Sequence, residues 1–256
     1  MLKEICRKRI MSRSLGLEIT MEEKRKIYKH EIIITSILTL CPIILGLILW
    51  DQLPDRVATH FDINNVPNGW SSKGFAVFGI PSILFLLHIF CIAATRFDPK
   101  NKNVSRKLIA VIIWIVPVIS IVVNGAILLY AIGRTVNMGM MANLLCGILF
   151  LAIGNYLPKC RQNYSIGVRT PWALNDEENW NKTNRFAGWC FLFAGVGFLL
   201  NSVFTLPAIL FLVIPVCILL PVGYSFILYR KQNERFQLCC ICGKIMGMVN
   251  ENLYND

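Results

Sequence analysis

The fold is decided by residues 186–229, FAGWCFLFAGVGFLLNSVFTLPAILFLVIPVCILLPVGYSFILY, which contain no charged side chain. A helix needs about 20 apolar residues to cross a bilayer, so this stretch is too long for one crossing and suits two. Polar residues and a proline between Asn201 and Pro207 supply a break in its middle. The stretch therefore predicts two membrane-spanning helices, over 186–204 and 208–228.

The rest of the chain repeats this pattern. Four more long stretches without Asp, Glu, Lys or Arg predict spans over 32–50, 74–95, 108–133 and 139–157. The 256 residues are 55% hydrophobic and 16% charged, whereas soluble domains average about 25% charged residues. The sequence predicts an all-α, polytopic integral membrane protein with about six transmembrane helices, and it excludes a disordered chain or an ordinary soluble enzyme.

The distribution of basic residues predicts the orientation. If six spans cross the bilayer, 23 of the 26 Lys and Arg fall on one side and 3 on the other. The basic side of a membrane protein faces the cytoplasm, so both termini are predicted to be cytoplasmic. The net charge of +11 is then a topology signal that also favours contact with anionic lipid headgroups. No nucleic-acid partner is predicted, because no basic helix carries base-reading side chains.

Spans and loops predict a linear domain organisation. Its parts are a basic cytoplasmic segment (1–30), the first two spans with an outside loop (31–95), the third span with its flanking loops (96–138), spans four to six with a cytoplasmic loop (139–228), and a cytoplasmic tail (229–256). Residues 1–20 look like an extension in front of MEEKRKIYKH, so translation is expected to begin at Met11 or Met21 if not at Met1.

The outside loop, residues 51–73, holds the first set of candidate residues. Turn formers predict a compact, irregular segment: Pro54, Pro67 and Asn68-Gly69. Trp70 is expected at the membrane interface as an aromatic anchor. Asp55, His60 and Asp62 could jointly bind a metal or a cationic ligand, or they could hydrogen-bond the loop to itself. The second interpretation is favoured because no metal-ligand spacing is present, so no metal and no cofactor is predicted.

The inside loop, residues 154–185, contains more signals for defined local structure than a simple connection between two spans requires. Pro171 pushes the preceding residue into an extended conformation. Asn175 is an expected N-cap with Glu178 three residues further on, so a helix is predicted to start at about Asp176 and to run into the fifth span. Trp172 and Trp180 are expected at headgroup level. A well-anchored interfacial loop without further function is the simpler alternative.

Both loops resemble known families. The inside loop resembles the signature of the SdpI family of bacterial membrane proteins, at Asn163, Gly167, Arg169, Thr170, Pro171, Trp172, Leu174, Trp180 and Thr183. The outside loop resembles a domain of unknown function that often precedes it, at Leu53, Pro54, His60, Phe61, Gly69, Trp70 and Lys73. The chain departs from the SdpI pattern at Ala173, where the family usually has Thr, and at Asn184, where it usually has His.

The resemblance implies immunity to a bacteriocin-like antimicrobial peptide, a secreted toxin that acts on membranes. The protein would bind the toxin or shield the bilayer, with Asp55, His60, Asp62 and Trp70 as toxin-facing candidates. The cytoplasmic signature would stabilise the bundle or report to a cytoplasmic regulator. A receptor without an immunity role is the alternative. A small-molecule or lipid transporter is disfavoured because the spans lack charged residues.

Other polar groups receive structural predictions. His88, Asn124, Asn143 and Asn201 lie within spans and are expected to hydrogen-bond helices together. Cys239, Cys240 and Cys242 resemble half of a zinc site and lack the second cluster that a closed site needs. The sequence holds no nucleophile elbow, no His-Glu metal motif and no Walker sequence, so the protein is not predicted to be an enzyme.

Overall fold

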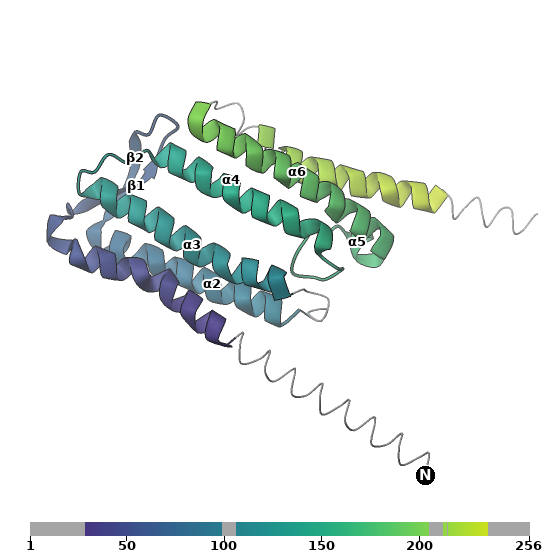
Figure 1. The fold of residues 1–256 in the computed structure, drawn as a ribbon, viewed down its shortest axis with the longest axis horizontal. Helices are drawn as coiled ribbons and strands as arrows, with labels where there is room; N and C mark the ends of the chain where they lie inside the picture. The colour runs from purple at the N-terminus through teal and green to yellow at the C-terminus, as the bar shows by residue number, and fades with distance from the viewer. Residues whose placement is uncertain (1–28, 99–105, 205–211, 214, 235–256) are drawn as a thin grey trace, which may run out of the picture. The chain divides into compact units, whose positions relative to one another are not determined.

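A computed structural model describes residues 29–98, 106–204, 212–213 and 215–234. The tail cysteines and the proposed start sites lie outside these residues. The long helices are Lys29–Ile48, α2 (Ile80–Arg96), α3 (Arg106–Ala131), α4 (Met138–Tyr156), α6 (Glu177–Phe204) and a helix over 215–234. Short helical turns are η1 (Trp50–Gln52), η2 (Phe75–Gly79), η4 (Leu157–Lys159) and α5 (Pro171–Asn175), and the strands are β1 (Arg56–Phe61) and β2 (Pro67–Ser72) (Figure 1).

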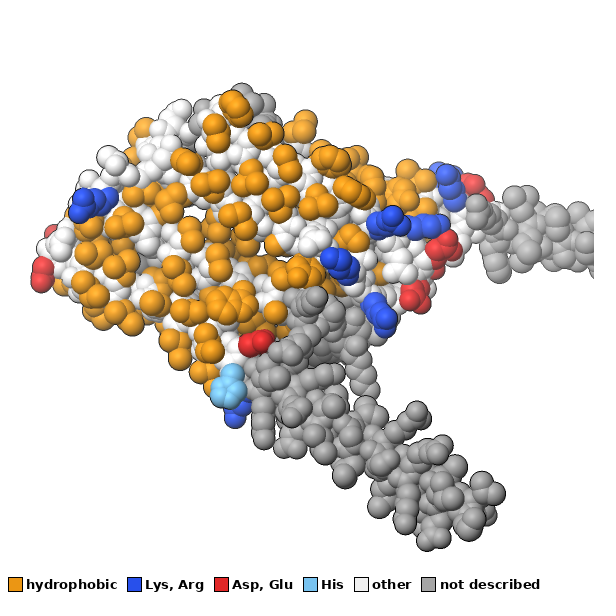
Figure 2. All heavy atoms as spheres, in the orientation of Figure 1, with side chains coloured by type: hydrophobic (Ala, Val, Ile, Leu, Met, Phe, Trp, Pro, Cys, Tyr) orange, Lys and Arg blue, Asp and Glu red, His pale blue; other side chains and the backbone are white. Residues whose placement is uncertain are grey.

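Five described helices are long and apolar enough to cross a membrane, which confirms a polytopic helical membrane protein. They are Lys29–Ile48, Phe75–Arg96, Leu108–Ala131, Met138–Lys159 and Glu177–Phe204. The sixth predicted span, 208–228, includes residues that are not described, and its described part from 215 onward is helical. Hydrophobic side chains cover the face drawn in Figure 2, as expected where lipid replaces water.

The described residues divide into two compact units, and the first comprises 29–60, 67–92 and 112–136. Its core includes Leu53, Val77 and Leu128, and a neighbouring cluster joins Val57 of β1 to Ile127 of α3. Because Val57 has no exposed surface, this strand is anchored to the helical core and does not lie free in solvent.

The outside loop is a β-hairpin, so the prediction of an irregular segment was wrong. The Asn68-Gly69 pair lies within β2 and does not form the turn. The turn is formed by residues 62–66, where the Asp62 carboxylate accepts hydrogen bonds from the backbone N–H groups of Asn64 and Val66, at 2.9 and 2.8 Å. Asn65 has φ +64, a conformation that Asn tolerates better than most residues. These local bonds position the hairpin turn.

The second unit comprises the described residues within 61–66, 93–111 and 137–234. Its helices α4 and α6 lie side by side and antiparallel (Figure 1). A Cβ on Gly154 would lie 2.8 Å from the carbonyl oxygen of Gly188, and one on Gly195 would lie 3.0 Å from that of Gly147. Small residues allow such close backbone approach in membranes. Asn201 also donates to Asn143 of α4 at 2.8 Å, which confirms the interhelical bond predicted for both.

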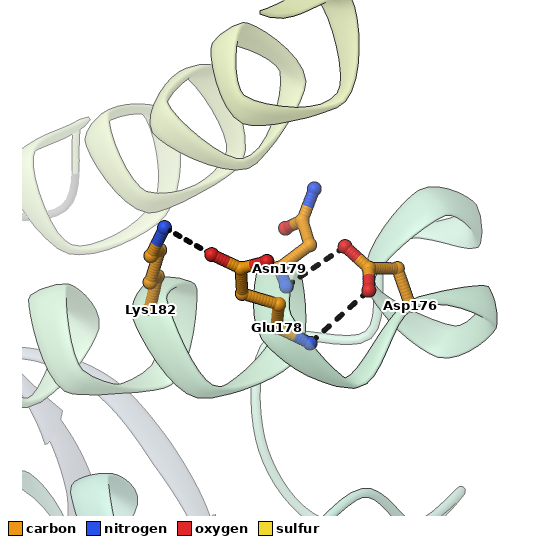
Figure 3. A network of polar contacts seen from close by, with 4 residues as sticks. All are labelled: Asp176, Glu178, Asn179 and Lys182. Atoms are coloured by element: carbon orange, nitrogen blue, oxygen red, sulfur yellow. Dashed lines mark hydrogen bonds and ion pairs between the residues drawn. The ribbon is translucent and has the colours of Figure 1, made fainter. Parts of the chain in front are cut away.

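The N-cap of α6 is Asp176 and not Asn175, so the predicted capping residue was wrong by one position. The two carboxylate oxygens of Asp176 accept the N–H groups of Glu178 and Asn179, at 3.1 and 2.9 Å (Figure 3). Asn175 instead ends the short helix α5. The prediction that a helix runs from about Asp176 into the fifth span is confirmed.

Replacing Asp176 with Ala is expected to lower the free energy of unfolding by about 0.5–2 kcal/mol, the usual cost of a lost N-cap. Asn175→Ala is the matched control and should stay within about 0.5 kcal/mol of the parent, because this side chain is exposed. Denaturant unfolding in detergent micelles, followed by a thiol-reactive dye, measures both. A larger loss for Asn175→Ala would contradict the assignment.

Candidate functional site: the signature loop and the hairpin

The signature loop begins with a turn built around Asn163, which has no exposed surface. Its side-chain oxygen accepts the N–H groups of Ser165 and Ile166 at 2.9 and 2.7 Å, and its amide nitrogen donates to the carbonyl of Arg161 at 2.7 Å. Asn readily forms such side-chain-to-backbone turns. Asn163 therefore shapes the loop and is not available to a ligand.

Trp180 and Asn184 hold the middle of the loop against α6. The fully buried Trp180 indole donates to the carbonyl of Cys160 at 2.8 Å. The Asn184 oxygen accepts the N–H of Val168 at 2.9 Å. Gly167 has φ +115, and a Cβ there would lie 2.6 Å from that same oxygen. Protein encloses the Trp180 side chain, so it does not contact lipid headgroups, whatever its depth.

Asn184, which stands where the family usually has His, thus makes a packed structural contact. The Asn184 amide also donates to the carbonyl of Trp180 at 3.0 Å. A neutral amide offers an acceptor and a donor at once. Asn184 therefore bonds to both the loop and its own helix, and these bonds do not depend on a change of protonation state. Ala173, the other departure, is completely buried, which a small side chain suits.

Thr170 and Asn179 tie the loop to the helix over 215–234. The Thr170 hydroxyl caps α5 at the N–H of Ala173 and lies 2.9 Å from the hydroxyl of Ser225. The amide of Asn179 donates to the Ser225 carbonyl at 3.0 Å, and its oxygen accepts from the Ser225 hydroxyl at 2.8 Å. Thr183 donates to the same Asn179 oxygen at 2.9 Å. These signature residues connect two elements about 50 positions apart.

Asp98 was missed by sequence reasoning. This buried carboxylate accepts the N–H of Tyr164 at 2.9 Å and the hydroxyl of Ser165 at 2.6 Å. It lies more than 60 residues before them, and such a separation leaves no local pattern to read. Its one signal is that it is the single acid in the basic segment 96–107.

The loop also presents an outward surface. Arg161, Tyr164 and Arg169 are exposed, and the Arg169 guanidinium donates to the carbonyl of Tyr164 at 2.6 Å. Trp172 packs against Phe226 and Tyr229, with ring centroids 5.4 and 5.9 Å apart. Leu174 and Pro171 complete the signature as parts of α5. The buried members of the signature hold these exposed side chains on a rigid support.

The toxin-facing candidates of the outside loop lie on or beside the β-hairpin. His60 and Asn68 face each other across the strands and are hydrogen-bonded, while Asp62 caps the turn. The backbone carbonyl of Asp55 accepts the N–H of Lys73 at 3.0 Å. Trp70 is 57% exposed. Among the described residues, no group of three His, Cys, Asp or Glu side chains could hold a metal ion, and the bonds of His60 and Asp62 are those of a loop bonded to itself.

Cys160 is expected to resist alkylation at neutral pH in the folded protein. Burial raises the pKa of this thiol, a hydrogen bond from Asn163 lowers it, and the nearby charge of Asp98 raises it again. The thiolate is the reactive form, so reaction with iodoacetamide should appear only as the pH rises through this elevated pKa. Peptide mass spectrometry at several pH values measures the labelling of Cys160, and the chain unfolded in denaturant is the control. Equal labelling of both forms at neutral pH would contradict the prediction.

Comparison with known proteins confirms the resemblance of both loops. Residues 159–227 match the SdpI/YfhL protein family, and residues 37–85 match a domain of unknown function, DUF1648. The chain is 27% identical over 208 residues to immunity protein SdpI of Bacillus subtilis (strain 168), a match that covers 78% of this chain and 97% of the relative. No solved structure matches the chain. The protein is thus a multi-pass protein of the plasma membrane, with one region that matches the SdpI/YfhL family behind another that matches DUF1648.

Proposed function

We propose that this protein protects its cell against a secreted, membrane-active peptide toxin. The observation that carries the proposal is the similarity to immunity protein SdpI over nearly the whole length of that relative. Similarity to one immunity protein does not fix the target of this one. We expect the toxin among peptides encoded near this gene.

The outside hairpin is the proposed toxin contact. Asp55, His60 and Trp70 are exposed on it, and Asp62 sets its turn. Lys73 lies 4.6 Å from the centre of the Trp50 ring, a cation–π contact that holds the base of the hairpin. Toxin arriving from outside would meet an aromatic and two polar side chains on a firm support.

The decisive experiment expresses the chain in a toxin-sensitive host and measures survival against each candidate peptide. The parent should raise survival, and His60→Ala and Trp70→Ala should lower it at equal amounts of protein in the membrane. Gln52→Ala, exposed just before the hairpin, is the matched control and should protect as the parent does. If the parent protects against no peptide of its own neighbourhood, the proposal fails.

A second function, recruitment of a cytoplasmic regulator, is favoured by the exposed Arg161, Tyr164 and Arg169 on the packed signature loop. Arg169→Ala would then abolish a transcriptional response to toxin while leaving survival conferred by the outside hairpin intact. Loss of protection together with loss of membrane insertion would instead make Arg169 a structural residue.

A further inference from the structure

Five polar side chains form a continuous seam inside the first unit. Thr35 and Thr39 come from the first helix, His88 from α2, and Ser120 and Asn124 from α3, and each is at most 2% exposed. This polar seam crosses predicted spans, where polar groups are costly and normally satisfied within the protein.

Hydrogen bonds link the polar seam from end to end. Thr35 Oγ1 lies 3.1 Å from His88 Nε2. The Thr39 hydroxyl donates to the carbonyl of Thr35 at 2.7 Å, and the Ser120 hydroxyl donates to the carbonyl of Thr39 at 2.7 Å. The Asn124 amide donates to the carbonyl of Ser120 at 2.8 Å and bonds within its own helix. The interhelical bond predicted for His88 is confirmed. The one predicted for Asn124 was wrong, because its amide bonds within α3, and Ser120 instead makes the contact between helices.

The bond lengths favour one placement of the protons in the seam. The Thr35 hydroxyl lies 2.8 Å from the carbonyl oxygen of Glu31 and 3.1 Å from that of Ile32, and both oxygens can only accept. When Thr35 donates to these carbonyls, its bond to His88 takes the proton from Nε2, and the neutral imidazole keeps a lone pair on Nδ1. The Asn124 amide nitrogen donates to the carbonyl of Ser120 at 2.8 Å and to its hydroxyl at 3.3 Å, and the amide oxygen remains as an acceptor.

Two buried acceptors are left over. His88 Nδ1 and Asn124 Oδ1 have no exposed surface and no hydrogen-bond partner among the described residues. Buried polar atoms in native proteins are nearly always paired, and internal water commonly supplies the partner. Both atoms need a donor.

We propose that the polar seam is an internal water site, in which water molecules donate to His88 Nδ1 and to Asn124 Oδ1. Water fits the requirement because it supplies donors without charge. A cationic donor such as ammonium would bury a positive charge, at a free-energy cost that a neutral water molecule does not carry. The membrane-embedded part of the first unit would thus be hydrated beside His88.

The test uses the whole protein labelled with ¹⁵N-histidine in lipid vesicles. The chain contains three histidines. The signals that disappear in the His88→Gln variant are those of the His88 ring. Solid-state NMR should show hydrogen on Nε2 of His88, a bare Nδ1 with a hydrogen-bonded shift, and magnetisation transfer from water to that ring. The exposed His60 is the positive control for transfer from water.

Two results would overturn the proposal. One is a His88 ring that receives no magnetisation from water while His60 does, which would mean a dry seam. The other is hydrogen on Nδ1, which would reverse the need for a donor. Thr35→Val gives an independent reading, because it should remove the hydrogen-bonded shift of Nε2 while contact between water and Nδ1 persists.

Discussion

Trp180→Ala is expected to destabilise the protein by about 3–5 kcal/mol, the usual cost of truncating a fully buried Trp. Trp180 has no exposed surface, and its indole N–H donates to the Cys160 carbonyl at 2.8 Å. The substitution removes the side chain that fills the space between the signature loop and α6. It also leaves a buried carbonyl without its donor, which adds to the loss.

Helix α6 supplies a matched control for this prediction. Trp189 lies nine residues further along the same helix and is 56% exposed, so Trp189→Ala should cost less than about 1 kcal/mol in the same detergent. Reactivity of the buried thiols with a dye during denaturant titration measures both variants. Comparable losses for the two would show that the loop does not depend on Trp180. Trp180→Phe, which keeps an aromatic ring, should recover part of the stability and leave the Cys160 carbonyl unpaired.

The spans could be predicted from sequence because the bilayer imposes one simple rule. Without water, backbone groups must be satisfied within the helix and side chains must be apolar over about 20 residues. Predicted spans 74–95 and 139–157 therefore agree closely with Phe75–Arg96 and Met138–Lys159. The fifth helix begins at Glu177, well before its apolar part, and capping chemistry made that polar extension predictable as well.

The loops were harder, because competing local signals decide them. Asn-Gly is the strongest short hairpin-turn signal, but here the Asp62 carboxylate organises a turn a few residues earlier, and Gly69 instead lies in β2. A Cβ on Gly69 would lie 2.9 Å from Cβ of His60, so this glycine serves cross-strand packing. The amino-acid sequence alone does not show whether the turn preference of Asn-Gly or a cross-strand contact of the glycine decides the local structure.

The signature loop shows the same limit for the site. Its motif was visible as a resemblance, yet the sequence did not indicate that Asn163, Thr183 and Trp180 would be buried structural residues. Their partners are distant in the chain, as with Asp98 and the backbone N–H of Tyr164. The sequence correctly identified the signature loop as a distinctive segment. It did not show which of the loop's side chains face inward.

Gly154→Ala is expected to lower the free energy of unfolding by about 1–3 kcal/mol, as overpacking usually does. A Cβ there would lie 2.8 Å from the carbonyl oxygen of Gly188 and 2.9 Å from the backbone nitrogen of Leu192. Both are main-chain atoms of α6, which cannot rotate away as a flexible side chain would, so the two helices must separate. The separation would also strain the signature loop, since α6 carries Trp180 and Asn184.

Gly125→Ala is the control, because a Cβ at this α3 position meets nothing within 4 Å. Ala also favours the helix over Gly by about 1 kcal/mol, so Gly125→Ala should be neutral or stabilising while Gly154→Ala destabilises despite the same gain in helix propensity. The opposite signs make the pair a direct test of backbone contact between α4 and α6. If Gly154→Ala were as stable as Gly125→Ala, the helices would not approach as closely as the structure has them, and the loop would need another explanation for its position against α6.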